Sequence, residues 1–374
     1  MSEKHILILT ADAGMGHRSA AEAIKAALVE LYADRCQVDV MNPLDEADAP
    51  DIIRQIEQGY DEIVVKDQVL YSLAYHALDM PVVSDLTRAV ATRLLNDVIF
   101  RLVEQGRYDV IVTTYPTYAR PVANALMEVE RDVPVAVVIT DLTDVARLWF
   151  CRSATMHFVP TNEIRKQAYK NEIPATRVRV TGLPVHPRIA GETPPPDMLR
   201  ETLGWEKDLP TGLIVASART KQMATISRFL DRSGLNLQLA VVCGGAQDMY
   251  EHLLHADWQS VVHVYNWIDN MPQLLKASDF LVTKAGGLVV SEALACGLPL
   301  IITEALPGQE AGNVRYVVDN GAGVWAPGAA EVMVTVHDWL QSDPEKFAQV
   351  RANAQSLGKP RAAFNIAEAI WGLA

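Results

Sequence analysis

Short apolar runs alternate with helical patterns along the first half of the chain. Three near-continuous apolar runs, typical of parallel strands covered on both faces, are residues 5–10 (HILILT), 109–114 (DVIVTT) and 134–140 (PVAVVIT). After the first run, apolar positions at helical spacing predict a helix from Ser19 to about Tyr32, and Ser19 with Glu22 predicts a capping box at its start. Residues 52–107 have a more helical pattern and predict an elaboration over the first sheet.

The strand and helix pattern restarts after a Pro- and Gly-rich segment at 187–198, which predicts an interdomain linker. The strands predicted beyond it are 212–217, 237–244, 261–265, 280–283 and 298–303. Two successive arrays of this kind predict an α/β protein with two Rossmann-like, doubly wound parallel sheets. We expect a first domain over 1–190, a second over 191–360, and ligands in a cleft between the carboxyl ends of their strands.

Composition fits a globular protein of two domains, with 374 residues of which 49% are hydrophobic. The four cysteines form no C-x-x-C pair and no metal spacing, which favours reduced thiols in a cytosolic protein. The apolar run near the N-terminus is too short for a signal peptide, and no window approaches the roughly 18 apolar residues of a membrane span.

The net charge of −13 argues against nucleic acid as a partner, since phosphate binding needs a basic surface. Charge is uneven, however. The segment 147–188 holds eight Lys or Arg and two Glu, a net charge of +6. This segment is either a solvated helix face or a patch that faces lipid.

The segment 283–323 combines a Gly-Gly turn with a helix, an acidic residue within that helix, a buried strand and a polar loop. Gly286 and Gly287 would let a ligand approach the backbone, and the amides that open the helix can bind an anion. Glu292 is placed to accept hydrogen bonds from a sugar diol, and Gln309 and Glu310 follow the next strand at the same sheet edge. An ordinary strand–turn–helix unit would give the same pattern.

His17 ends a loop in which Gly14 and Gly16 flank Met15, between the first strand and the first helix. An imidazole at that place could serve as a general base, although a structural or capping histidine is the alternative. Asp12 in the same loop and Asp141 after a predicted strand could orient His17, or could cap helices instead.

Several motifs resemble those of one enzyme family, in the same order along the chain. They are residues 6–24 (ILILTADAGMGHRSAAEAI), 137–150 (VVITDLTDVARLWF), 159–169 (VPTNEIRKQAY), 178–189 (VRVTGLPVHPRI), 262–287 (VHVYNWIDNMPQLLKASDFLVTKAGG) and the segment 283–323. The family is that of the family-28 glycosyltransferases with the GT-B fold. Within it the chain most resembles the monogalactosyldiacylglycerol synthases and the bacterial diacylglycerol glucosyltransferases.

The resemblance implies a role for individual residues. His17 would be the base, supported by Asp12 and Asp141, and the loop with Gly14 and Gly16 would belong to the acceptor domain. That domain would include Arg147, Trp149 and Phe150 near the acceptor or membrane, and a C-terminal helix at 361–374 that packs back on it. The donor site would contain Ile268 for uracil, Lys284, Gly286, Gly287, Leu288, Glu292, Gln309, Glu310 and Asn313, the last supporting the loop of Gln309 and Glu310.

Two places depart from the family pattern. Residues 216–225 (ASARTKQMAT) contain no glycine where relatives carry a glycine-rich turn, and Val289 stands where relatives usually have Thr. Arg219 and Lys221 could compensate for the missing glycines as cationic diphosphate ligands.

The resemblance implies an inverting transferase that moves galactose or glucose from a UDP-sugar to a lipid hydroxyl, with diacylglycerol as the expected acceptor. UDP-sugar would be the co-substrate, and no metal or other cofactor is expected. The protein would be cytoplasmic and peripheral at the inner face of the cell membrane. Two alternatives are a nucleotide-sugar 2-epimerase, which shares the fold, and a non-catalytic UDP- or lipid-binding homologue, which the two departures favour.

Overall fold

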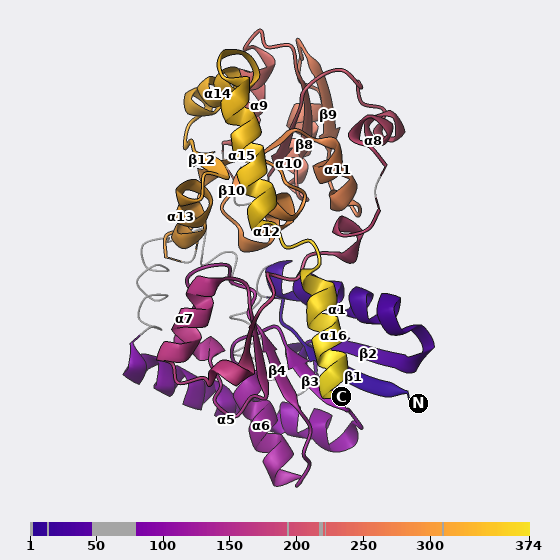
Figure 1. The fold of residues 1–374 in the computed structure, drawn as a ribbon, viewed down its shortest axis with the longest axis vertical. Coiled ribbons are helices and arrows are strands. Elements are labelled where there is room, and N and C mark those ends of the chain that lie inside the picture. The colour runs from indigo at the N-terminus through magenta and orange to yellow at the C-terminus, as the bar shows by residue number, and fades with distance from the viewer. Residues whose placement is uncertain are drawn as a thin grey trace. The chain divides into compact units, whose positions relative to one another are not determined.

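The computed structural model of the chain describes residues 3–12, 15–46, 80–192, 194–216, 220, 222–308 and 310–374. Contacts between residues divide the chain into two compact units (Figure 1). The first contains Met1–Pro187, the short segment Pro307–Gln309 and Arg361–Ala374, and the second contains Arg188–Leu306 and Glu310–Pro360.

A parallel sheet of six strands forms the centre of the first unit, in the order β2-β1-β3-β4-β5-β6. Its strands are β1 (Lys4–Leu9), β2 (Cys36–Met41), β3 (Val110–Thr113), β4 (Val135–Val138), β5 (Met156–Val159) and β6 (Val178–Val180). Every residue of β3, β4 and β5 is buried, as expected for strands covered on both faces. The three apolar runs predicted in this half are therefore confirmed as strands.

The described residues of the first unit form five longer helices: α1 (Met15–Tyr32), α5 (Pro81–Gln105), α6 (Ala119–Glu128), α7 (Asn162–Lys170) and α16 (Ala362–Leu373). Helix α1 begins at Met15, four residues before the predicted start, so Ser19 and Glu22 lie inside the helix. The predicted capping box is therefore wrong. Of the predicted helical elaboration, 81–105 is helical, and 47–79 lies outside the described residues.

The last helix, α16, packs against the start of the chain. The Lys4 ammonium donates to the Trp371 carbonyl at 2.9 Å, and the Trp371 indole stacks on the Tyr32 ring with centroids 4.0 Å apart. Figure 1 shows α16 beside α1. Residues far apart in sequence thus complete one unit.

A second parallel sheet of six strands forms the centre of the second unit, in the order β12-β11-β10-β7-β8-β9. Its strands are β7 (Thr211–Val215), β8 (Gln238–Val242), β9 (Val261–Tyr265), β10 (Phe280–Lys284), β11 (Leu300–Glu304) and β12 (Gly323–Trp325). The five strands predicted here are confirmed, and β12 is an additional short edge strand.

The helices of the second unit are α8 (Pro196–Leu203), α9 (Met223–Asp231), α10 (Gln247–Leu254), α11 (Met271–Ala277), α12 (Gly287–Ala295), α13 (Ala311–Asp319), α14 (Ala329–His337) and α15 (Pro344–Leu357). Within the described ranges of both units, no helix has the length and apolar character needed to cross a membrane. Two doubly wound parallel sheets confirm the predicted α/β class.

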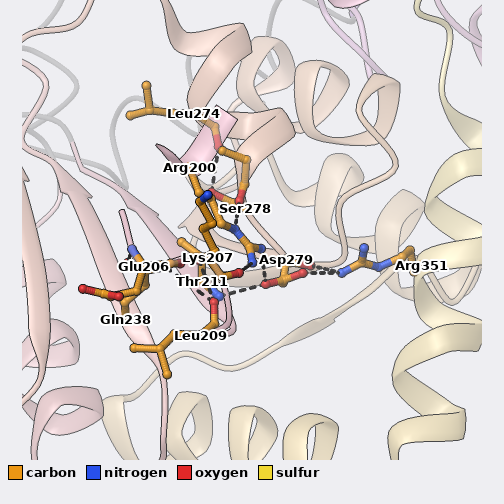
Figure 2. A network of polar contacts seen from close by, with 11 residues as sticks. Arg200, Glu206, Lys207, Leu209, Thr211, Gln238, Leu274, Ser278, Asp279 and Arg351 are labelled. Carbon is orange, nitrogen blue, oxygen red and sulfur yellow. Dashed lines mark hydrogen bonds and ion pairs between the residues drawn. The ribbon is translucent and has the colours of Figure 1, made fainter. Parts of the chain in front are cut away.

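A partly buried ion-pair network ties together four elements of the second unit (Figure 2). One Asp279 carboxylate oxygen accepts from the Arg200 guanidinium and from the Thr211 amide, both at 2.8 Å. The other accepts from Arg351 at 3.1 Å. Arg200 is only 7% exposed and also donates to the carbonyls of Ala277 and Lys207. Asp279 therefore joins α8, α15 and the first residues of β7 and β10.

Candidate active site

Each sheet has a topological switch point, where the strand order changes direction. In the first sheet it lies between β1 and β3, and in the second between β7 and β10. Loops that leave the carboxyl ends of two such strands diverge, and ligands of doubly wound proteins bind there. His17 follows β1, and the Gly286–Gly287 turn follows β10. The two strongest sequence candidates therefore lie at the switch points of their own sheets.

The imidazole of His17 is fixed through one of its two nitrogens. Nδ1 lies 2.9 Å from the Thr114 carbonyl oxygen and 2.7 Å from the Thr140 hydroxyl oxygen. A carbonyl oxygen can only accept, so Nδ1 carries the proton and Nε2 keeps its lone pair. Across the described part of the chain, no side chain or backbone group hydrogen-bonds Nε2. The ring is therefore held in the form that can accept a proton at Nε2.

Three buried threonines surround this histidine, and we call them the threonine cradle: Thr10, Thr114 and Thr140. They follow the neighbouring strands β1, β3 and β4 at their carboxyl ends. The Thr114 hydroxyl lies 2.9 Å from that of Thr10 and 3.1 Å from the His17 carbonyl oxygen. Sequence reasoning missed the cradle, although each of the three predicted strands ends in threonine.

Burial, one carboxylate and the Thr114 carbonyl act on the pKa of His17. Burial lowers the pKa of His17 below its ordinary value of 6.5, and the negative charge of Asp141 opposes that shift. The Trp149 indole N–H donates to the Asp141 carboxylate at 2.8 Å and so fixes the position of this charge. His17 is therefore neutral at pH 7, as a general base must be.

The carboxylate of Asp12 is paired with a residue in the first turn of α1. The Arg18 guanidinium donates to both Asp12 carboxylate oxygens, at 2.9 and 2.7 Å, and this contact is the main reason why the pKa of Asp12 is lowered. Of the two carboxylates predicted to orient His17, Asp141 is the one whose charge acts on the imidazole. Gly16 lies in the first turn of α1, whereas Gly14 lies outside the described residues.

The predicted acceptor segment is mostly core. Trp149 and Phe150 are 1% and 5% exposed, because both side chains pack into the hydrophobic core of the first unit. This burial contradicts a membrane-facing role for either ring. Arg147 is half-buried, and its carbonyl accepts from Arg88 at 2.9 Å.

In the second unit, helix α12 begins directly at the glycine turn. Gly286 is its N-cap residue, no side chain caps it, and Leu288 lies in the first turn. The first amides of a helix have no intrahelical acceptor, so those at the start of α12 are donors for an anion. The φ angle of Gly286 is −65°, which any residue adopts, so close ligand approach stays the predicted reason for glycine.

Glu292 lies half-buried on α12, and its carboxyl group has no hydrogen-bond or ion-pair partner among the residues that the structure describes. Burial raises the pKa of its carboxyl from 4.5 to about 7. A carboxyl group that is buried yet unpaired is unusual unless a ligand supplies the partner.

Both carboxylate oxygens of Glu310, a predicted sugar contact, already have partners within the protein. It is 6% exposed, one oxygen lies 2.5 Å from the Lys284 ammonium, and the other accepts from the Leu306 amide at 2.9 Å. Asn313 donates to the Ala285 carbonyl at 2.8 Å and thereby ties α13 to the glycine turn. Lys284, Glu310 and Asn313 therefore brace the loops after β10 and β11. A sugar hydrogen bond would require Glu310 to release one of its present partners.

Of the remaining candidates, the structure describes only Ile268. Ile268 is half-buried just after β9, and its contact with uracil stays a prediction. Arg219, Lys221 and Gln309 lie outside the described residues. In the ranges that are described, no three His, Cys, Asp or Glu side chains gather in a way that could hold a metal ion.

Two family models match the chain. The model for monogalactosyldiacylglycerol (MGDG) synthase matches residues 17–185, and that for glycosyl transferases group 1 matches residues 204–357. The boundary between the matches lies near the boundary between the two units.

Solved structures share the fold at low sequence identity. MurG of Acinetobacter baumannii is 17% identical with a TM-score of 0.59, and the match covers 99% of each chain. UDP-GlcNAc 2-epimerase from Neisseria meningitidis bound to UDP-GlcNAc is 12% identical with a TM-score of 0.64, covering 99% of this chain and 100% of that one. These likenesses confirm the GT-B fold.

Curated relatives match over nearly the whole chain. Monogalactosyldiacylglycerol synthase 1 of Arabidopsis thaliana is 30% identical over 97% of this chain and 70% of its own length. Monogalactosyldiacylglycerol synthase 2 of the same plant is 31% identical over 98% of this chain and 80% of its own. The chain therefore belongs to the monogalactosyldiacylglycerol synthase family.

Proposed function

We propose that this protein transfers galactose from UDP-galactose to the free hydroxyl of diacylglycerol, with inversion at the anomeric carbon. The observation that carries the proposal is the state of His17: a neutral imidazole, protonated at Nδ1, with Nε2 open at the switch point of the first sheet. The names of the relatives supply the sugar and the acceptor.

In the proposed step, the acceptor oxygen attacks the anomeric carbon from the face opposite UDP. The bond between that oxygen and the anomeric carbon forms as the bond to the β-phosphate oxygen breaks, and the electron pair leaves with UDP. The acceptor proton moves to Nε2 of His17. Donor amides at the start of α12 meet the charge that develops on the diphosphate.

One assay separates this proposal from its alternatives. The purified protein is incubated with labelled UDP-galactose, UDP-glucose or UDP-N-acetylglucosamine over diacylglycerol vesicles, and the products are separated and examined by NMR. A β-galactosyl lipid is the expected product, since UDP-galactose has the α configuration. An α-linked product would refute inversion, and a glucosyl lipid would reassign the sugar. Epimerised UDP-sugar would favour the 2-epimerase alternative. UDP binding without turnover would favour a non-catalytic homologue.

Glu292→Ala should weaken UDP binding by about 1–3 kcal/mol, the loss expected when a charge-assisted hydrogen bond to a ribose hydroxyl is removed. Calorimetry with UDP measures the change. Glu331→Ala, which changes an exposed residue of α14 in the same unit, is a control that should bind UDP normally. Unchanged affinity in the Glu292 variant would remove Glu292 from the nucleotide site.

The same residue should also make donor binding depend on pH. Because the Glu292 pKa of about 7 lies above its ordinary 4.5, the unliganded carboxyl holds its proton at pH 6 and releases it by pH 8. UDP-galactose does not titrate in this range and should bind more tightly as the pH rises. Glu292→Gln should abolish this slope, and a slope that persists would assign it to another group.

The loop at 216–225 tests whether cationic side chains replace the missing glycines. We expect the double variant Arg219→Ala, Lys221→Ala to lose UDP affinity more than UMP affinity, because the second phosphate would lose its cations. Calorimetry with both nucleotides measures the difference. Equal affinities in the variant and the parent would show that these two residues do not compensate.

A further inference from the structure

We propose that Thr140 is a positioning residue for His17: its hydroxyl oxygen holds the imidazole with Nδ1 protonated and shares that proton with the Thr114 carbonyl during the reaction. This inference rests on the proposed role of His17 as the base. It concerns a residue that contacts the histidine and not the substrate.

The geometry places two oxygen atoms on one nitrogen. Nδ1 of His17 lies 2.7 Å from Thr140 Oγ1 and 2.9 Å from the Thr114 carbonyl oxygen. Since the carbonyl fixes the proton on Nδ1, the Thr140 oxygen is a second acceptor of the same N–H. Thr140 is only 6% exposed and Thr114 is fully buried, so water cannot easily replace either contact.

The second acceptor matters most after proton transfer. When Nε2 takes the acceptor proton, the ring becomes a cation whose Nδ1–H donates more strongly, and hydrogen bonds to a charged group are stronger than those to a neutral one. Two oxygen acceptors therefore favour the imidazolium over the neutral ring. Removing one of them should make His17 a weaker base.

The other groups around the ring have different contacts. Asp141 acts through its charge, and the Trp149 N–H is committed to Asp141. Tyr115 presents its ring to the imidazole edge-on, with centroids 5.1 Å apart. On the histidine's own element, Arg18 is paired with Asp12. Within the described structure, Thr140 is the side chain that hydrogen-bonds the imidazole, and its removal leaves these charges in place.

The test compares Thr140→Val, which keeps the shape and removes the hydroxyl, with Thr140→Ser, which restores it. We expect the valine variant to lose about tenfold or more in kcat, the loss typical of a hydrogen bond to a charged group, with the KM for UDP-galactose unchanged. The acid limb of its pH–rate profile should move to lower pH. The serine variant should recover most of the kcat and reverse most of the shift in the acid limb. A valine variant with parental kcat and an unmoved acid limb would overturn the proposal.

An NMR measurement distinguishes a failure of this inference from a failure of the proposed function. With ¹⁵N-labelled histidine in the unliganded protein, the His17 nitrogen shifts report its tautomer and pKa without any turnover, and His17→Ala assigns the signals. Thr140→Val should lower the pKa, and the serine variant should restore it. An identical titration in the parent and the valine variant refutes the role of Thr140. An altered titration in a protein without transferase activity supports that role and refutes the proposed function.

Discussion

Replacing His17 with alanine should reduce kcat by about 10²–10⁴-fold, the range usual for loss of general-base assistance. The donor KM should change little, because His17 lies in the first unit and the donor candidates that the structure describes lie in the second. In the parent, the acid limb should lie below pH 6.5, since burial lowers the pKa of His17 and protonation of Nε2 removes the base. The variant should lack this limb. Initial rates on diacylglycerol vesicles at varied pH and donor concentration measure kcat, the donor KM and the acid limb.

His5→Ala is the matched control for this experiment. His5 lies near the opposite end of the same strand β1, where its Nε2 contacts Asp39 at 2.7 Å. Its loss should leave kcat within about twofold of the parent, far from the effect of losing a base. A His17→Ala protein that keeps more than about a tenth of the parental kcat would exclude the base role. Asp141 would then be the next candidate.

Asp279→Ala should destabilise the second unit by about 3–5 kcal/mol, because it leaves the buried Arg200 guanidinium without its carboxylate. The substitution also removes the acceptor of the Thr211 amide and the partner of Arg351. Chemical denaturation measures the free energy of unfolding. UDP binding at low temperature should persist, since Asp279 precedes β10 and the glycine turn follows it.

Glu201→Ala supplies the comparison for that measurement. Glu201 forms an ion pair with Lys207 at 3.0 Å in the same region, but both side chains are at least half exposed. An exposed pair contributes about 0–1 kcal/mol, so the two variants should differ clearly. A loss of less than about 1 kcal/mol for Asp279→Ala would mean that the network is no stronger than a surface pair.

Sequence patterns predicted eight of the twelve strands that the structure describes, because most buried parallel strands are continuous apolar runs. The strands β2, β5, β6 and β12 were not predicted. The same patterns placed His17 at the carboxyl end of β1, since its loop follows such a run directly. The start of α1 was misplaced because Ser19 and Glu22 fit a capping box, while the helix begins at Met15. Capping residues in the sequence indicate where a helix can begin. Tertiary contacts decide at which of these places it does begin.

Pairings between distant residues could not be predicted from local patterns. Trp149 was placed near the acceptor or membrane, yet its ring packs into the core and its indole N–H donates to Asp141. Lys284 and Glu310 were assigned separately to the ligand, although they contact each other across 26 positions. The threonine cradle needs three strands in register, so its members are recognisable only once the strand order is known.

The docking of α16 on the first unit affects how the chain folds during synthesis. Residues 1–187 leave the ribosome well before 361–374 are made, an interval of roughly 10–40 s at ordinary elongation rates. Until then, Tyr32 and Lys4 lack the indole and the carbonyl of Trp371. The second unit, continuous but for a short loop, can complete its contacts first. The unit whose synthesis begins first is therefore the one that completes its contacts last.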